Sequence, residues 1–144
     1  MRNKTNAVVT VVFICLVVSI IGCGKGPAPY TMEAMGKLSK AIESVETPVP
    51  KPGINKEESI KLLYDWYKNI YSKAGYDLDK SIIQLASDFK KDPQYAAPAL
   101  NQSLTLVVSY EFIKIRKDKT IDMSKAIPQD VLNALDNIAT KDQK

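Results

Sequence analysis

The sequence predicts an all-α protein, a small helical bundle of about four to five helices behind a short N-terminal tether. Three observations favour this fold class. Five segments after residue 30 place apolar residues at helical intervals, several are bounded by residues that cap or end helices, and no Asn-Gly or Asp-Gly pair marks a β-hairpin. Roughly 120 of the residues follow residue 22, which suits one small domain.

The first predicted helix begins after Thr31, whose hydroxyl can cap it. Its apolar stripe recurs at intervals of three and four residues, at Met35, Leu38, Ile42 and Val45. Three prolines between residues 47 and 53 then end the helix, because proline cannot continue one. We interpret this run as a stiff, extended connection between two helices. The alternative is a proline-rich recognition peptide.

The clearest predicted helix runs from residue 56 to Ala74. Asn55 can cap it, Glu58 stands three residues later in the capping-box position, and Gly75 follows as a C-terminal stop. On a helical wheel its apolar and aromatic residues fill an arc of about 200°, whereas a surface helix needs a stripe only somewhat wider than about 100°. The arc is therefore wider than burial against one neighbour requires.

Two interpretations of this wide arc remain open. Either the helix packs against neighbours on two sides, or one shoulder of the arc faces a partner or a ligand. The two shoulders are Leu62 with Trp66 and Tyr64 with Tyr71. Aromatic side chains with one polar end are common at such surfaces. These four residues are the candidate partner-binding residues.

Two further helices are predicted from capped apolar faces. Asp77 can cap the first of them and Asp92-Pro93 closes it. Its apolar face gathers Leu78, Ile82, Leu85, Ala86 and Phe89. Pro128 stands where the first residue of the last helix is expected. The stripe of that helix consists of Val131, Leu132, Leu135 and Ile138.

The segment from Pro98 to about Lys117 fits two structures. Its apolar residues alternate between residues 104 and 112 as in a strand, and the composition is rich in β-branched and aromatic residues. The same residues also fit a buried helix, and about 20 residues is long for a strand. We favour the helix, because a lone strand would have nothing obvious to pair with. The alternative is an α+β fold with a short hairpin around residues 104–122.

The residue types argue against an enzyme. The chain contains no His, which removes Ser-His and Cys-His activation and the commonest transition-metal ligand. No acidic cluster has the spacing of a calcium-binding EF-hand, and no glycine-rich phosphate loop is present. The paired acids Glu57-Glu58 and Asp77/Asp79 stand at predicted helix starts, where they favour the helix dipole. We therefore expect no enzymatic activity, no metal site and no cofactor.

The charge balance argues against a nucleic-acid partner. The chain has 20 basic and 16 acidic side chains, and two of the basic ones, Arg2 and Lys4, belong to the extreme N-terminus. Local basic clusters occur at Lys90-Lys91 and between residues 114 and 119. We interpret them as solvated helix ends. The alternative is contact with acidic headgroups of a membrane.

The N-terminus carries the features of an export signal. Residues 7–21 contain no charge, but they are too few for a membrane span, which needs roughly 20 residues. They match the apolar core of a secretory signal peptide. The sequence Ile20-Ile21-Gly22-Cys23 then resembles the lipobox of bacterial lipoprotein precursors, in which two aliphatic or small residues and a Gly or Ala precede a Cys. The resemblance covers about the first 24 residues.

The resemblance implies a processing route. Residues 1–22 would form the signal peptide, cleaved after Gly22, and Cys23 would carry a covalent lipid as the only non-protein group. Residues 23–30, rich in Gly and Pro, would be the lipidated tether, residues 31–140 the helical domain and residues 141–144 a polar tail. Because Gly24 replaces the Asp that favours inner-membrane retention in enteric-type bacteria, the family rule implies the outer membrane, facing the periplasm.

These observations predict a membrane-anchored, non-enzymatic adaptor or assembly factor that binds another protein of the cell envelope. Pilotin-like, exclusion and immunity roles belong to this class. The alternative is a helical carrier or sensor of an apolar small ligand. A partner-binding surface would leave an exposed apolar strip, whereas a carrier would have an internal cavity of roughly 300 Å³ or more.

Overall fold

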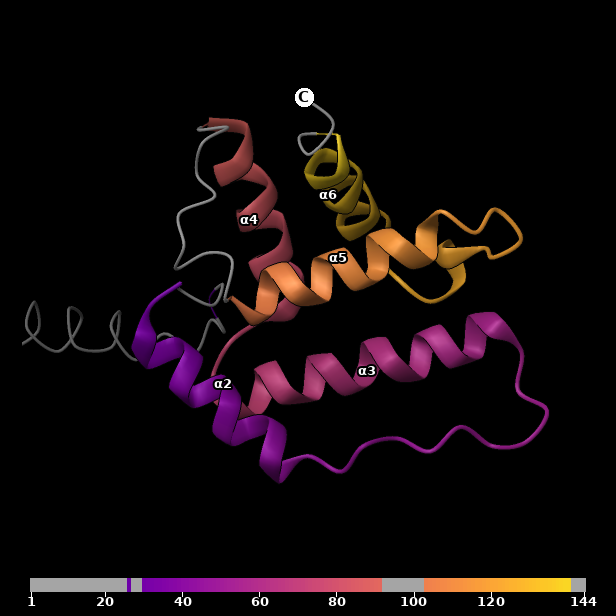
Figure 1. The fold of residues 1–144 in the computed structure, drawn as a ribbon, viewed down its shortest axis with the longest axis horizontal. Coiled ribbons are helices and arrows are strands. Elements are labelled where there is room, and N and C mark those ends of the chain that lie inside the picture. Colours follow the sequence, from indigo (N-terminus) through magenta and orange to yellow (C-terminus); the bar gives the residue numbers. More distant parts are fainter. Residues whose placement is uncertain (1–25, 27–29, 92–102, 141–144) are drawn as a thin grey trace, which may run out of the picture.

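The computed structural model describes residue 26 and residues 30–91 and 103–140, and over these residues the protein is helical with no strand (Figure 1). The elements are α2 (Met32–Ser44), α3 (Lys56–Ala74), α4 (Leu78–Lys91), α5 (Leu104–Arg116), the short 3₁₀ helix η1 (Met123–Lys125) and α6 (Gln129–Ala139). The all-α prediction is confirmed. All of these helices fall between residues 31 and 140.

The predicted capping interactions form as the sequence suggested. The Thr31 hydroxyl accepts a hydrogen bond from the Ala34 amide at 3.2 Å. Asn55 and Glu58 form a reciprocal capping box, with the Asn55 side chain accepting from the Glu58 amide at 2.7 Å. Gly75 ends α3 with a φ of 86°, a left-handed conformation that glycine adopts without strain.

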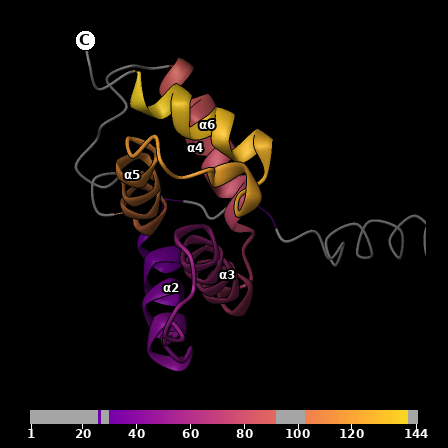
Figure 2. The same cartoon turned by 90° about the vertical axis from the view of Figure 1, so that its right-hand side faces the viewer.

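The helices form two groups with α5 between them (Figures 1 and 2). In one group α4 and α6 pack side by side, and both also contact α5. In the other group α2 packs against α3. Helix α3 joins the groups, because its C-terminal end leads through Gly75 directly into α4 and its aromatic side chains contact α5.

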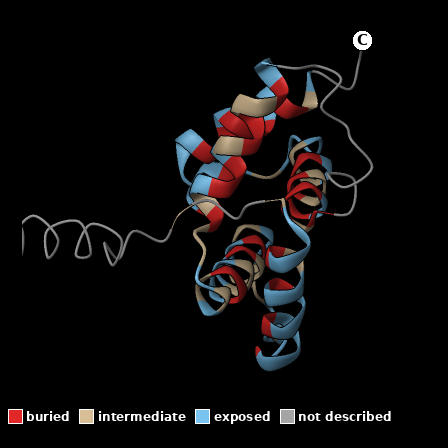
Figure 3. Ribbon diagram, turned by 90° about the vertical axis from the view of Figure 1, so that its left-hand side faces the viewer, coloured by how far each residue is buried: buried red, intermediate tan, exposed pale blue. Residues whose placement is uncertain are grey.

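The core lies where these helices meet. The buried positions face neighbouring helices and the exposed positions face outward (Figure 3). The largest fully buried side chains come from α3, α4, α5, α6 and the loop before α6: Tyr71, Phe112, Ile70, Leu78, Ile82, Leu85, Ile127, Leu132, Leu135, Ile138, Val108 and Val131. The predicted apolar faces of α4 and α6 are buried in full.

The ambiguous segment is helical from Leu104 to Arg116, so the hairpin alternative is wrong. Its buried residues follow helical spacing: Thr105, Leu106, Val108, Ser109, Phe112 and Ile113. A strand would have needed a paired neighbour for its backbone, whereas a helix satisfies its own N–H and C=O groups. The residues after α5 form a turn in which the Asp118 carboxylate accepts from the Thr120 amide at 3.0 Å.

Two details of the helices differ from the prediction. The buried face of α2 is centred on Ala34, Leu38 and Ala41, and Ile42 of the predicted stripe is 36% exposed. Small alanines allow close packing against α3, which rotates the buried face away from Ile42. Pro128 caps α6 one residue before the helix begins, although it was expected as the first helical residue.

The start of the domain is fastened to the junction between α3 and α4. The carbonyl oxygen of Gly26 accepts a hydrogen bond from the Asp77 amide at 2.9 Å, and Gly26 and Tyr76 form an isolated parallel bridge. The Tyr30 hydroxyl donates to the carbonyl oxygen of Ser81 on α4 at 3.5 Å. These two described residues of the predicted tether are therefore bound to the folded domain.

Several predictions fall on residues that the structure does not describe. The signal peptide, the lipobox with Cys23, the Asp92-Pro93 stop and the tail at residues 141–144 lie outside the described residues. Within the described residues, no helix is both long enough and apolar enough to cross a membrane.

Candidate functional site

The first predicted shoulder of α3, Tyr64 with Tyr71, belongs to the core. Tyr64 is 2% exposed and Tyr71 is 0% exposed. The Tyr71 hydroxyl forms a buried hydrogen bond of 2.8 Å with the Thr105 hydroxyl of α5, and the Tyr64 hydroxyl donates to the Asp79 carboxylate of α4. This corrects the interpretation that these tyrosines face a partner. Helices α4 and α5 cover this part of the wide apolar arc, so α3 packs against neighbours on a second side here.

The other shoulder, Leu62 with Trp66, is only partly buried. Trp66 packs against the core, and its ring centroid lies 4.9 Å from that of Tyr67. Its indole Nε1 is shielded from water and has no hydrogen-bond acceptor among the described residues. Trp66 thus lies at the edge of the core, and the prediction that this shoulder binds a partner stays a prediction.

The tyrosines of α3 remain neutral phenols. Burial raises the pKa of Tyr64, Tyr67 and Tyr71 far above the usual tyrosine range. A hydrogen-bonded carboxylate adds to the effect at two of them, and at Tyr67 this is Glu111 of α5, 2.6 Å from the hydroxyl. A phenol with a raised pKa is a poor base or nucleophile, so these groups are suited to holding α3 against α4 and α5.

An apolar groove between α2 and α5 is the surface that the sequence did not reveal. It has a volume of about 240 Å³ and is lined by Met35, Leu38, Ser39, Ile42, Leu104 and Val107. Val107 is 51% exposed although most of α5 is buried. Four of the lining residues follow the i, i+3, i+4, i+7 spacing of one face of α2. The groove therefore presents partly exposed apolar side chains from two helices.

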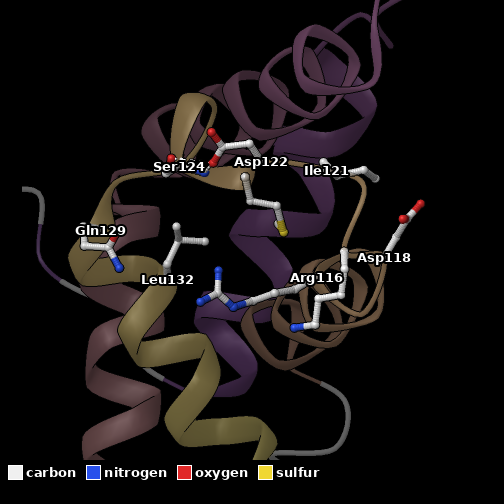
Figure 4. Close-up of a pocket in the computed structure, with 9 residues that line it drawn as sticks. Arg116, Asp118, Ile121, Asp122, Ser124, Gln129 and Leu132 are labelled. Carbon is white, nitrogen blue, oxygen red and sulfur yellow. Dashed lines mark hydrogen bonds between the residues drawn. The ribbon is translucent and has the colours of Figure 1, made fainter.

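A polar hollow of about 290 Å³ lies between the end of α5, η1 and α6 (Figure 4). Asp122 and Ser124 lie on one side of it and the guanidinium of Arg116 on the other. The Arg116 guanidinium is held by Asp136 through two hydrogen bonds of 2.6 and 2.7 Å. The Ser124 hydroxyl donates to the Asp122 carboxylate at 2.6 Å.

Two acidic groups of this hollow have structural partners. Asp122 caps η1 by accepting from the Ser124 amide, and the hydrogen bond from Ser124 lowers the pKa of that carboxyl. Asp118 accepts hydrogen bonds from Thr120 and from the Lys56 ammonium of α3, and its pKa is lowered to about 2. Each group thus stabilises the loop between α5 and α6. Among the described residues, no three His, Cys, Asp or Glu side chains gather as metal ligands.

The sequence predicted only part of the groove between α2 and α5. Met35 and Ile42 were placed on the apolar stripe of the first helix, but that stripe gave no sign that it would remain partly uncovered. Val107 lies in an almost wholly apolar segment, which indicates burial. The groove arises because α2 buries alanines instead. The sequence signal for such a groove is a predicted helix that carries alanines beside its large apolar residues, because the alanines can be buried in place of the larger side chains.

Comparisons of the chain with protein-family models, with curated proteins and with solved structures found no match.

Proposed function

We propose that the chain is a membrane-anchored lipoprotein that faces the periplasm and acts as a non-enzymatic adaptor or assembly factor for another envelope protein. Pilotin-like, exclusion and immunity roles are forms of this function. The lipobox around Cys23 supports the anchor, and the residue Gly24 supports the outer membrane as its place.

The observation that carries the binding role is the apolar groove between α2 and α5. Val107 and Ile42, which line this groove, remain 51% and 36% exposed. The lining residues of α2 stand three and four positions apart, with Leu104 and Val107 of α5 across the groove, and such ridges can receive the side chains of a further helix. We therefore assign the groove to an amphipathic segment of the partner protein, bound in the helix-in-groove manner.

The volume of the groove favours a protein segment over a small ligand. Pockets for small molecules usually enclose about 300–1,000 Å³ and bury most of the ligand. The groove holds about 240 Å³ and lies open at the surface, with half-exposed side chains along it. Such a shape covers one face of a bound helix and leaves the other face in contact with water.

The anchor is tested by replacing Cys23 with Ser and measuring the intact mass and the membrane fraction of the protein. The wild-type protein should lose its first 22 residues, gain the mass of a lipid and sediment with membranes. The Cys23→Ser variant should lack the lipid and appear in the soluble fraction. An unchanged mass together with unchanged membrane retention would refute the lipoprotein proposal.

The groove is tested by a photo-crosslinking amino acid placed at Val107, in lipidated protein expressed in its own membranes. The matched position is Ile83 on the outer face of α4, which is 38% exposed and lies outside the groove. We expect a discrete crosslinked product from position 107 and none from position 83. The product should disappear when Ile42 is replaced by Asp. Equal crosslinking from both positions would refute the groove as the binding site.

A further inference from the structure

The hydrogen bond at Gly26 brings the junction of α3 and α4 close to the proposed lipid. Gly26 is the third residue after Cys23, and three extended residue steps span at most about 11 Å. The Gly26 carbonyl is bound to the Asp77 amide at 2.9 Å. The whole predicted tether of eight residues would have allowed a reach of about 25 Å. The domain is therefore held with one particular side toward the anchor.

That side carries a cleft lined by lysines. A cleft of about 520 Å³ lies between α2 and the end of α3 and is lined by Lys37, Lys40, Ala41, Ser44, Lys73 and Ala74. Lys73 and Ala74 precede Asp77 by four and three residues, so the cleft begins within about 15 Å of the Gly26 attachment. Figure 3 views the molecule from the side on which α3 ends and α4 begins.

The lysines of this cleft are not fully neutralised. Lys73 donates to the carbonyl oxygen of Ser44 at 2.9 Å, and Lys37 pairs with Glu33 at 2.8 Å. Lys40 has no ion pair with a described residue. Three ammonium groups therefore line the cleft, and an ion pair joins only one of them, Lys37, to a described carboxylate. Each ammonium has three N–H donors, so those already bonded keep donors free for a further acceptor.

The neighbouring junction between α3 and α4 is electrically balanced. Asp77 and Asp79 stand near Lys68 and Lys80, and Lys68 pairs with Asp79 at 2.8 Å. The pKa of Lys37 is raised by its hydrogen bond to Glu33 and by the charge of that carboxylate. The lining of the cleft, by contrast, contains three lysines and no acidic side chain.

The basic clusters that the sequence singled out lie elsewhere. Lys90 and Lys91 end α4, about 20 Å along the helix from Asp77. The lysines between residues 114 and 119 lie in the last turn of α5 and just after it, and this end of α5 lies opposite the end of α3 in Figure 1. Neither cluster is close to the Gly26 attachment. A contact with acidic membrane headgroups was the alternative interpretation of those clusters. The α2–α3 cleft lies closer to the Gly26 attachment and is therefore the better candidate for such a contact.

We propose that the cleft of Lys37, Lys40 and Lys73 rests on the anionic phospholipid headgroups of the membrane that holds Cys23. This proposal rests on the lipidation of Cys23. Phosphate groups accept hydrogen bonds from lysine ammonium groups, and each lysine near an anionic surface strengthens attachment by about fivefold. The contact would fix the orientation of the domain, and the groove between α2 and α5 would keep one defined position relative to the membrane.

The experiment uses the mature lipidated protein in vesicles that contain a spin-labelled headgroup lipid. A fluorophore is attached through Gly36→Cys, where a new side chain meets no atom within 4 Å. The comparison position is Asn137→Cys, an exposed residue of α6. The introduced thiol is unique, because Cys23 carries the lipid and Cys15 leaves with the signal peptide. We expect quenching at position 36 in vesicles with phosphatidylglycerol, and loss of that quenching in pure phosphatidylcholine and at high salt.

The decisive comparison uses two triple variants with the same change in net charge. Replacing Lys37, Lys40 and Lys73 by Gln should abolish the quenching at position 36. The control, with Lys114, Lys117 and Lys119 replaced by Gln, should retain it. If both variants lose the quenching equally, the contact depends only on the net charge of the protein, and the proposal is overturned. The same conclusion follows if position 137 is quenched as strongly as position 36 in the wild-type protein.

Flotation and intact mass separate this proposal from the proposed function. Lipidated protein that floats with the vesicles but shows no quenching at position 36 overturns the cleft contact and leaves the anchor intact. Protein that carries no lipid on Cys23 overturns both. Circular dichroism of each variant confirms that the helices persist, because all six lysines are exposed side chains.

Discussion

Helix α2 and the α4–α6 pair are both amphipathic, yet they are buried by different kinds of side chain. The α4–α6 contact is made of large aliphatic residues such as Ile82, Leu85 and Leu135, which are fully buried. Helix α2 instead buries two alanines and Leu38 against α3 and leaves Ile42 at the surface. We therefore expect stability to be concentrated in the α4–α6 pair, whereas α2 leaves apolar side chains at the surface.

The largest effect is expected in the α4–α6 pair. Replacing Leu135, which is 0% exposed, by Ala should cost about 2–5 kcal/mol of the free energy of unfolding, because the change removes buried methyl groups and leaves a cavity. Chemical denaturation monitored by circular dichroism measures the loss. The matched control is Ile83→Ala on the outer side of α4, with an expected cost below about 1 kcal/mol. Similar costs at both positions would contradict the comparison.

The sequence predicted α4 and α6 well because their helical spacing and their burial agree. Helix α5 was ambiguous because it is buried on most sides, and an apolar segment of this kind loses the period that separates helix from strand. Tyr64 and Tyr71 were ambiguous for a related reason: a wide apolar arc has the same appearance whether a second helix or a partner covers it. Only the packing of α4 and α5 resolved it.

The groove and the lysine cleft could not be predicted, because each depends on contacts between distant segments. The groove joins α2 to α5 across more than 60 residues of chain, and the cleft joins Lys37 to Lys73. The bond from Asp77 to Gly26 is likewise invisible in the sequence. Helical periods fix which residues share a face, but they do not say which faces meet.

A smaller effect is expected where α3 joins the two groups. Tyr71→Phe removes the buried hydrogen bond to Thr105, whose side chain is 0% exposed and would be left without this partner. We expect a cost of about 1–3 kcal/mol. Double replacement with Thr105→Val should recover part of this loss, since it removes the unpaired hydroxyl as well. If the single and double variants are equally destabilised, the hydrogen bond does not account for the effect.

The raised pKa of Tyr71 predicts that the free energy of unfolding falls at alkaline pH. Burial raises the pKa of Tyr71 above the value of about 10 that it has in an unfolded chain, and the hydrogen bond from Thr105 opposes this only in part. The neutral phenol is therefore favoured by folding. Its contribution is complete below pH 10 and is lost as the pH rises beyond it. Tyr71→Phe should show a shallower loss of stability above pH 10 than the wild-type protein.

Trp66 tests the boundary between the core and a binding surface. Its ring packs partly against the core, so Trp66→Ala should cost about 1–2 kcal/mol, less than the 3–5 kcal/mol typical of a core tryptophan. Thermal melts give the loss, and the crosslinking pattern from position 107 shows whether partner binding changes. A loss of 3 kcal/mol or more would return Trp66 to the core and remove the shoulder of Leu62 and Trp66 from the candidate surfaces.

The smallest change in stability is expected within α2 itself. Ile42 is 36% exposed and Leu38 is 3% exposed, although both belong to the apolar stripe of this helix. Ile42→Ala should cost less than about 1 kcal/mol, because alanine has the higher helix propensity and little buried surface is lost, whereas Leu38→Ala should cost about 2–3 kcal/mol.

For binding we expect the reverse order: Ile42→Ala should reduce crosslinking more than Leu38→Ala does. Ile42→Ala removes an exposed side chain of the groove and should weaken crosslinking from position 107 while the protein stays folded. Leu38→Ala lowers the melting temperature, but because Leu38 is only 3% exposed in the groove lining, it should weaken crosslinking less than Ile42→Ala does when both proteins are folded. Denaturation curves and crosslinking yields measured on the same preparations separate the two effects. Loss of stability without loss of crosslinking in Ile42→Ala would return this side chain to a packing role and leave α2 without a binding face.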